Sequence, residues 1–596
     1  MENLYNRIRG FKFGSKLPEK SKINAALSSF SHRERVVFSV LVLVLMLSTV
    51  LILNTINRYF MVTVPNYGGT ISEGIVGNPR FVNPVLANNV ADQDLVTLIY
   101  SGLMRKGSDG NLIPDLAAEY TISNDGLKYT FVLKDNISFH DGKPVTIDDI
   151  LFTVDTVKDG VIKSPQKANW DGVTATKIDE KTIEFNLKQP RALFLENTTL
   201  GIMPSYLWSN TPIELNSLNT EPIGSGPYMI KNVNKQSSGG VASYELTSFK
   251  KFALGRPYIN NINLHFYTNE ENLISALENG DIDQISSITP TNAEILKNKG
   301  YKIESAVLPR VFGLFFNSNI NKIFLDKTIV KAINDSIDKD RIIKEVLAEY
   351  GVTTDGPIPP SMVEYQEINS GEETSREEVL QKVRDSLTKA GWTKNEAGFL
   401  EKVTQEKTTQ GKKTVLGKKT TTPLEFVIST GNAGELAKTA EIIKENLAEV
   451  GIKVEIQTFD INSLNQDIIR PREYSALLFG QIINNESDLF AFWHSSQRKD
   501  PGLNIALYAN ASVDKILEDA FLATNEEART KKYIQFENEI RKDMPAVFLY
   551  SPNFVYLVSK NLNGLSMDHI VFPSNRFLNS YLWYTEKHGV WRIFVK

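Results

Sequence analysis

Residues 111–149 constrain the fold most strongly, because turn, strand and helix signals follow one another closely there. Residues 124–126 (Asn-Asp-Gly) predict a turn, since Gly tolerates positive φ and Asn and Asp side chains bond to their own backbone. Apolar residues then alternate with other residues over 129–133, which is typical of a strand. A second turn is predicted at Asp141-Gly142, and residues 146–149 can cap a helix that begins at Ile150. The stretch therefore predicts hairpins followed by a helix.

The same stretch resembles the signature of the family 5 extracellular solute-binding proteins, the peptide- and nickel-binding components of ABC importers. The matching segments are Pro114-Asp115-Leu116-Ala117, residues 125–133, residues 139–146 (F-H-D-G-x-P-x-T) and Asp148-Asp149. Further segments, at residues 100–103, 224–228 and 504–514, are similar to later motifs of the family. The resemblance extends over most of the chain from Thr70 to about Leu565.

This resemblance implies an α/β, bilobed periplasmic-binding-protein-like fold of the class with an extra domain, preceded by one N-terminal transmembrane helix. A chain of 596 residues also exceeds what a single hydrophobic core usually serves. The expected parts are a cytoplasmic basic segment (1–35), a transmembrane signal anchor (36–53), lobe I (62–105 and 216–310), an extra domain on lobe I (106–215), lobe II (311–555) and a return to lobe I (556–596). Residues 401–422, rich in Lys and Thr, are expected to form an exposed hairpin tip or a partly disordered loop.

Residues 36–53 form an uncharged, almost wholly apolar run. As a helix this run spans roughly 27 Å, about the thickness of a bilayer core. Basic residues precede it, so the positive-inside rule predicts a single-pass protein of the cell membrane with a cytoplasmic N-terminus. The bulk of the chain is then extracellular or periplasmic. The alternative is a cleavable signal peptide, but the run is long for one and no Ala-x-Ala site follows.

Composition excludes several other classes of function. The formal net charge of -4 argues against a nucleic-acid binder. The absence of cysteine excludes disulfides, cysteine–zinc sites, a thiol nucleophile and the lipidated N-terminal Cys of many solute-binding proteins. The six histidines do not occur in His-Glu-x-x-His or another metal spacing, and no Ser lies in Gly-x-Ser-x-Gly. We therefore expect a protein that is not an enzyme and has no cofactor or metal site.

His140-Asp141 allows two interpretations. A His beside a carboxylate can transfer protons in catalysis. Alternatively, Asp141-Gly142 shapes a turn and His140 forms local hydrogen bonds. We favour the second, because no nucleophile with an orienting partner lies nearby in the sequence.

Two regions supply candidate ligand-binding residues. The loop of residues 77–84 matches a family loop at the edge of the ligand cleft, so Arg80 and Phe81 are candidates, and Arg80 could instead be solvated. In peptide-binding members an Asp after a later strand binds the peptide's α-amino group, and the corresponding position here is Ile483. We expect a carboxylate a few residues later to replace it, and Trp493 to form either an apolar cleft wall or core. The candidates of this second region are Glu486, Asp488, Trp493, His494, Ser495 and Asn504.

The resemblance implies a monomeric, membrane-anchored protein that binds short peptides and delivers them to the permease subunits of an ABC importer. Two alternatives are a nutrient sensor or chaperone built on the same binding fold, and a binder of a non-peptide ligand such as nickel. One histidine near the expected cleft does not favour nickel, because metal sites generally need several ligands.

Overall fold

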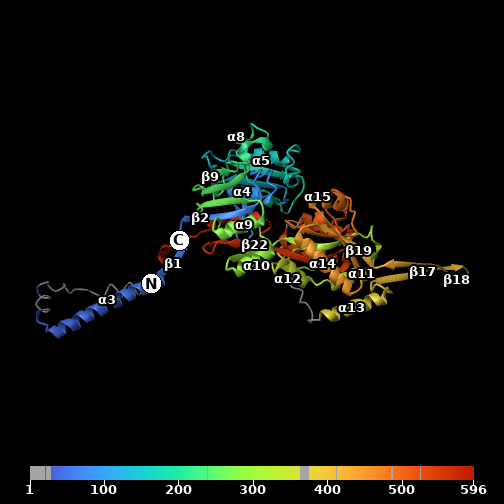
Figure 1. Ribbon diagram of the computed structural model, residues 1–596. Helices are drawn as coiled ribbons and strands as arrows, with labels where there is room; N and C mark the ends of the chain where they lie inside the picture. The colour runs from blue at the N-terminus through green and yellow to red at the C-terminus, as the bar shows by residue number, and fades with distance from the viewer. Residues whose placement is uncertain are drawn as a thin grey trace. The chain divides into compact units, whose positions relative to one another are not determined.

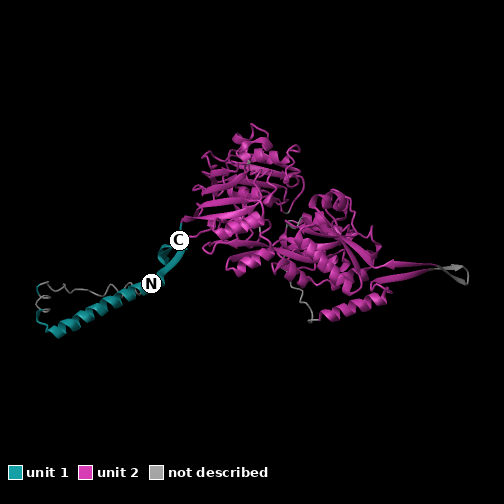
Figure 2. Ribbon diagram, viewed as in Figure 1, with its two compact units in different colours: residues 1–66, 586–596 teal, residues 67–585 magenta. Residues whose placement is uncertain are grey.

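The computed structural model describes residues 21, 28–191, 193–237, 239–286, 288–362, 375–410, 413–484, 488–523 and 525–595. The chain divides into two compact units, which Figure 2 shows in different colours. The first unit contains residues 1–66 and 586–596, and the second contains residues 67–585. Residues 62–66 and 586–596 therefore belong with the N-terminal helix, whereas the sequence assigned both segments to lobe I.

The first unit contains a long helix and a two-stranded sheet. Helix α3 (His32–Phe60) includes the apolar run, buries none of its residues and is long and apolar enough to cross a membrane. Ser31 caps it, because the Ser31 hydroxyl accepts from the backbone N–H of Glu34 and the Glu34 carboxylate accepts from that of Ser31. Strand β1 (Met61–Pro65) follows at once and pairs antiparallel with β23 (Lys587–Trp591).

In the second unit one sheet runs through two lobes, in the strand order β20-β19-β21-β14-β22-β12-β2-β11-β10-β9, where β22 is Ala546–Val558. We call the part built on β2, β11, β10 and β9 lobe I, and the part built on β14, β21, β19 and β20 lobe II. The lobe I strands are β2 (Gly68–Val76), β9 (Tyr228–Lys235), β10 (Val241–Ser248), β11 (Ile259–Tyr267) and β12 (Gln284–Ile285). The lobe II strands are β14 (Arg310–Phe316), β19 (Glu425–Gly431), β20 (Lys453–Phe459) and β21 (Ala476–Ile482). The predicted bilobed α/β fold is confirmed.

A separate antiparallel sheet, in the order β5-β6-β8-β7, elaborates lobe I. Its strands are β5 (Ala117–Ile122), β6 (Lys128–Leu133), β7 (Val173–Lys177) and β8 (Thr182–Leu187). The predicted alternation holds in β6, where Tyr129, Phe131 and Leu133 are buried. Helix α5 (Ile147–Lys158) follows, and Thr146 caps it in a reciprocal arrangement with Asp149. The two turns form as predicted, with Gly126 and Gly142 at positive φ. The helix begins at Ile147 and not at the predicted Ile150, because Thr146 is its N-cap.

Helices cover both faces of the lobe II sheet. Along β14, Leu314 and Phe316 contribute to one core cluster, and Val311 and Phe315 contribute to another. A continuous apolar strand of this kind is typical of a sheet that is buried on both sides. The helices of this lobe are α11 (Lys327–Ser336), α12 (Lys339–Leu347), α13 (Arg376–Lys389), α14 (Gly434–Glu449), α16 (Asp488–Trp493), α17 (Ala511–Leu522) and α18 (Glu526–Asp543).

Two neighbouring chain segments join the lobes. Strand β22 (Ala546–Val558) places Val547 in a lobe II core cluster and Tyr556 in the lobe I cluster. Beside it, β13 (Lys302–Val307) passes into β14 through Leu308, whose N–H donates to the Pro552 carbonyl at 2.9 Å. Lobes joined by short adjacent segments are suited to hinge motion.

The Lys- and Thr-rich region is a β-hairpin. Strands β17 (Leu400–Gln410) and β18 (Lys413–Pro423) pair antiparallel and extend from lobe II (Figure 1). Thr favours strands, which agrees with the predicted hairpin.

Candidate functional site

A cavity of about 280 Å³ lies between the two lobes, beside the hinge. This volume is close to the lower end of the usual range for small-molecule sites. Lobe I contributes residues from β3 (Met104–Lys106), from α7 (Phe194–Asn197) and from loops, and lobe II contributes the first turn of α18 and several loops. The lining residues are Lys106, Gly110, Leu193, Glu196, Pro309, Ser361, Met362, Asn484, Glu526, Arg529, His569, Ile570 and Val571.

The described lining residues carry charges of both signs. Lys106 Nζ lies 3.5 Å from Glu196 Oε1 on the lobe I side, where both side chains are partly exposed. Glu526 and Arg529 lie on the lobe II side, in the first turn of α18. Opposite charges on both walls suit a ligand that is itself zwitterionic, because such a ligand can pair with both signs at once.

Two close backbone approaches shape the walls of the cavity. Gly110 has φ of +80°, and a Cβ there would lie 2.7 Å from the ring of His569. Ile483 is fully buried, and its N–H donates to the carbonyl of Pro309 at 2.9 Å. The position at which peptide-binding relatives are expected to place an Asp is therefore filled by an apolar core side chain.

Of the two carboxylates expected to replace that Asp, the structure describes only Asp488. Asp488 is the first residue of α16, and its Oδ2 accepts from the backbone N–H of Asn484 at 2.7 Å. This bond joins the start of α16 to Asn484, which itself lines the cavity. Glu486 lies outside the described residues.

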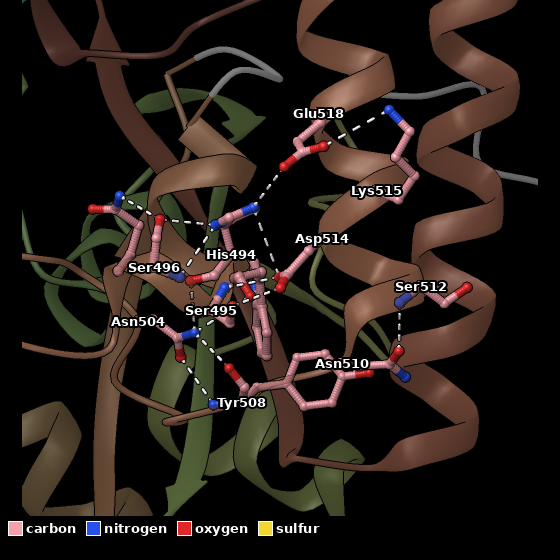
Figure 3. Close-up of polar contacts among 12 residues, drawn as sticks. His494, Ser495, Ser496, Asn504, Tyr508, Asn510, Ser512, Asp514, Lys515 and Glu518 are labelled. Atoms are coloured by element: carbon pink, nitrogen blue, oxygen red, sulfur yellow. Dashed lines mark hydrogen bonds and ion pairs between the residues drawn. The ribbon is translucent and has the colours of Figure 1, made fainter.

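Figure 3 shows that His494, Ser495 and Asn504 belong to one polar network within lobe II. The N–H and hydroxyl of Ser495 donate to the two oxygens of Asp514, at 2.8 and 2.5 Å. The Asn504 amide donates to the carbonyls of Trp493, His494 and Tyr508, at 3.0–3.3 Å. These bonds join the segment after α16 to the start of α17.

His494 occupies the edge of this network. Its ring stacks on Phe490, with centroids 4.2 Å apart, and its Nδ1 lies 2.8 Å from Ser496 Oγ. Its Nε2 lies 3.6 Å from Glu518 Oε1 (Figure 3). The structure thus brings the three predicted polar residues together, at a place other than the lining of the cavity.

Trp493 lies in the core and offers no wall to a ligand. Its side chain is fully buried in the lobe II cluster that also contains Phe315, Phe536 and Phe548. Of the two interpretations open in the sequence, the structure supports core packing. The interpretation of Trp493 as an apolar wall of the cleft is therefore corrected, because its side chain is fully buried.

Arg80 and Phe81 form part of the loop between β2 and α4 (Val90–Ile99). Their backbone N–H groups donate to Asp92 Oδ1 at 2.7 and 3.0 Å, and the Arg80 guanidinium lies 4.9 Å from the Phe81 ring centroid. Burial raises the pKa of the Asp92 carboxyl, against the effect of these two hydrogen bonds. Neither residue is among the described residues that line the cavity, and Arg80 is exposed.

His140 contacts a second sequence motif instead of a reacting group. Its Nε2 lies 3.1 Å from the carbonyl oxygen of Gly226, and its Nδ1 accepts from the N–H of Gly224. Burial lowers the pKa of His140 to about 4. The turn at Gly142 forms as predicted, but the bonds of His140 reach 84 and 86 residues along the chain and are not local.

Sequence reasoning missed the charged lining residues Lys106, Glu196, Glu526 and Arg529. They come from both lobes and share no motif, so only the tertiary fold brings them together. A local signal exists only for α18, where Asn525 caps the helix.

Comparison with known proteins agrees with the observed fold. The family model described as bacterial extracellular solute-binding proteins, family 5 Middle, matches residues 111–501. The chain is 26% identical over 533 residues to the oligopeptide-binding protein AppA of Bacillus subtilis, covering 88% of this chain and 93% of that protein.

Solved structures show the same fold. The structure of Bacillus subtilis AppA in complex with a nonapeptide has a TM-score of 0.64 and 25% identity, and the match covers 87% of this chain and 99% of that one. The structure of Campylobacter jejuni NikZ in complex with Ni(L-His) has a TM-score of 0.65 and 24% identity, with 86% and 99% covered. At that identity the second likeness concerns the fold alone.

Proposed function

This chain belongs to the bacterial extracellular solute-binding proteins of family 5, and we propose that it captures short peptides in the cavity between its lobes and delivers them to an ABC importer. The observation that carries the proposal is the set of charges on the two walls beside the hinge. A free peptide has an ammonium group at one end and a carboxylate at the other. Binding of the peptide changes no covalent bond, so the activity that we propose is binding without catalysis.

Each charged wall has a role in this proposal. Lys106 and Arg529 are the candidates to meet a peptide carboxylate, and Glu196 and Glu526 are the candidates to meet an ammonium group. Charge-assisted hydrogen bonds of this kind strengthen as water leaves a closing site. The complex of AppA with a nonapeptide supports a peptide as the class of ligand.

The hinge provides the means of capture. Because β22 and the β13–β14 connection join the lobes, the two walls can approach each other by bending at Leu308 and Pro552. A ligand that touches both walls favours the closed form, since only that form offers all the contacts. Delivery to permease subunits, by a monomer, is the output that we propose for the closed form.

We infer that α3 is an uncleaved signal anchor. Its apolar length suits a single crossing, and basic residues precede it in the sequence, which favours a cytoplasmic N-terminus with the second unit outside. An anchor of this kind would replace the lipidated Cys, for which the sequence has no residue. Arg80, Phe81, Asp488, His494, Ser495 and Asn504 then act, in this proposal, by supporting the loops of the two lobes.

A nickel ligand has less support. Among the described residues, no group of three or more His, Asp or Glu side chains could hold a metal ion. The likeness to NikZ concerns the fold. A sensor or chaperone output of the same binding fold is the alternative to delivery, and it would use the same cavity for binding.

The test is calorimetric titration of the full chain in detergent with a pool of short peptides. We expect Lys106→Ala and Arg529→Ala to weaken binding about tenfold each, which is the loss of about 1.4 kcal/mol. Amidation of the peptide C-terminus should reduce these losses, because the carboxylate partner is then absent. Lys231→Ala on β9 and Arg470→Ala are matched controls, as both side chains are exposed and lie away from the cavity. Unchanged affinity in both cavity variants, or no heat with any peptide pool, would overturn the site or the function respectively.

A further inference from the structure

The pairing of β1 with β23 returns the C-terminus to the end of α3. In the antiparallel register Pro65 lies opposite Lys587, and Met61 lies opposite Trp591. Met61 follows directly after the last residue of α3, so Trp591 is the residue of β23 nearest to the helix. The chain beyond Trp591 therefore continues in the direction from which α3 emerges.

Two contacts fix Trp591 against the helix. Its indole N–H donates to Asn57 Oδ1 at 2.7 Å, and its ring stacks on that of Phe60 with centroids 6.1 Å apart. Asn57 lies four residues beyond the apolar run, which is about 6 Å along a helix. If the apolar run fills the bilayer core, Trp591 lies at the level of the lipid headgroups.

Three apolar residues shortly after Trp591 are exposed. The short 3-10 helix at Arg592–Phe594 leaves Ile593 73% exposed and Phe594 71% exposed, and Val595 is 44% exposed. On the helix side, Tyr59 is 83% exposed. Contiguous exposed apolar side chains of this kind mark a contact surface.

The chemistry of this group is that of a membrane interface. Trp and Tyr are enriched at the headgroup level, where an apolar ring and a polar edge are both accommodated. Arg58 and Arg592 are exposed beside them and can meet lipid phosphates. A protein partner would leave unexplained why the group lies at the end of the apolar helix.

We propose that residues 591–595 are a second membrane contact, which lies in the outer headgroup interface of the bilayer that α3 crosses. This inference rests on the proposed role of α3 as an uncleaved anchor. Ile593 and Phe594 enter the upper acyl region, while Trp591 and Tyr59 stay at the headgroups. Both strands of the β1–β23 ribbon are then attached to the membrane, β1 through α3 and β23 through residues 591–595.

The absence of cysteine allows a direct test on the full chain. Single-Cys variants Phe594→Cys, Leu45→Cys and Val161→Cys are spin-labelled and placed in nanodiscs of phosphatidylcholine and phosphatidylglycerol in equal amounts. Leu45 lies within α3, and Val161 is 81% exposed in the second unit, so these labels report lipid and water respectively. Power saturation compares collision with oxygen, which concentrates in lipid, and with a water-soluble nickel complex.

We expect the label at residue 594 to show an oxygen-to-nickel collision ratio several-fold above that at residue 161. A ratio equal to that at 161, with a lipid-like ratio at residue 45, would overturn the second contact and leave the anchor intact. A water-like ratio at residue 45 would overturn the anchor, and the inference with it. The outcomes for the two proposals are therefore distinguishable.

Tryptophan fluorescence gives an independent readout without a label. The other five tryptophans, at positions 170, 208, 392, 493 and 583, are all at most 4% exposed, whereas Trp591 is 41% exposed. Brominated lipids should quench a component of the emission that the variant Trp591→Phe lacks. Equal quenching of the wild-type chain and this variant would contradict the proposal.

Discussion

Arg576 and Glu73 form an ion pair that is completely buried in lobe I, with Arg576 Nη2 and Nε 2.6 and 2.9 Å from Glu73 Oε1. Asp94 accepts from the same guanidinium at 2.6 and 2.8 Å, and the Tyr556 hydroxyl donates to Glu73 Oε2 at 2.7 Å. The four residues come from the C-terminal segment, β2, α4 and β22. The cluster therefore fixes residues near the C-terminus to the strand that crosses the hinge.

Removal of this guanidinium should be strongly destabilising. Arg576→Met leaves two carboxylates buried without their partner, which costs about 3–5 kcal/mol of unfolding free energy. Urea denaturation measures the loss. Arg470→Met is the matched control, because Arg470 is mostly exposed, and its change should stay within about 0.5 kcal/mol. Similar stabilities of the two variants would contradict a structural role for the cluster.

His140 should make stability depend on acid. Because burial lowers the pKa of folded His140 to about 4, the unfolded chain binds the proton more readily than the folded chain. The contribution of neutral His140 to the unfolding free energy is complete above the unfolded pKa of about 6.5 and is lost progressively as pH falls toward about 4, by about 3 kcal/mol. Urea denaturation at several pH values across this window should show that the unfolding free energy falls more steeply with decreasing pH for the wild-type chain than for His140→Gln. Parallel pH profiles would exclude the effect.

Gly224 is required by a close approach to the end of α4. A Cβ at this position would lie 2.1 Å from the carbonyl oxygen of Ile99, which is backbone and cannot move aside cheaply. Gly224→Ala should cost more than about 2 kcal/mol of unfolding free energy. Gly160→Ala serves as the control, since nothing lies within 4 Å of a Cβ there. Thermal unfolding compares the two variants. Equal stabilities of Gly224→Ala and Gly160→Ala would contradict this prediction.

Trp493→Ala separates core packing from ligand contact. Loss of this buried side chain should reduce the unfolding free energy by about 3–5 kcal/mol. Peptide affinity of the variant, measured where it is fully folded, should change little. Phe594→Ala, at a mostly exposed aromatic position, should leave stability nearly unchanged. A large loss of affinity with normal stability would restore Trp493 to the site.

Local patterns in the sequence were sufficient for much of the fold. The alternation in β6, the Thr146 cap and the apolar run of α3 each depend on neighbours within a few residues, and all three form as predicted. The fate of Trp493 could not be read in this way. Whether the aromatic residue at the end of α16 faces a cleft or the core depends on α18 and β22, which lie further along the chain.

The candidate site was less accessible to prediction for the same reason. Lys106 and Arg529 are separated by more than four hundred residues and line one cavity only because the tertiary fold brings the two lobes together there. The family resemblance pointed to the loop after β21, and of that loop Asn484 does line the cavity. The return of residues 587–591 to β1 had no local signal either, because their pairing partner lies near the N-terminus.

The most direct test of peptide capture is native mass spectrometry of the full chain extracted in mild detergent, followed by denaturation and sequencing of whatever is released. The account predicts a mixture of short peptides, each bound once per chain. Release of a metal or of one non-peptide species would contradict the assignment of peptides while leaving the fold intact. A chain that is empty, and that no peptide pool stabilises against heat, would contradict capture itself.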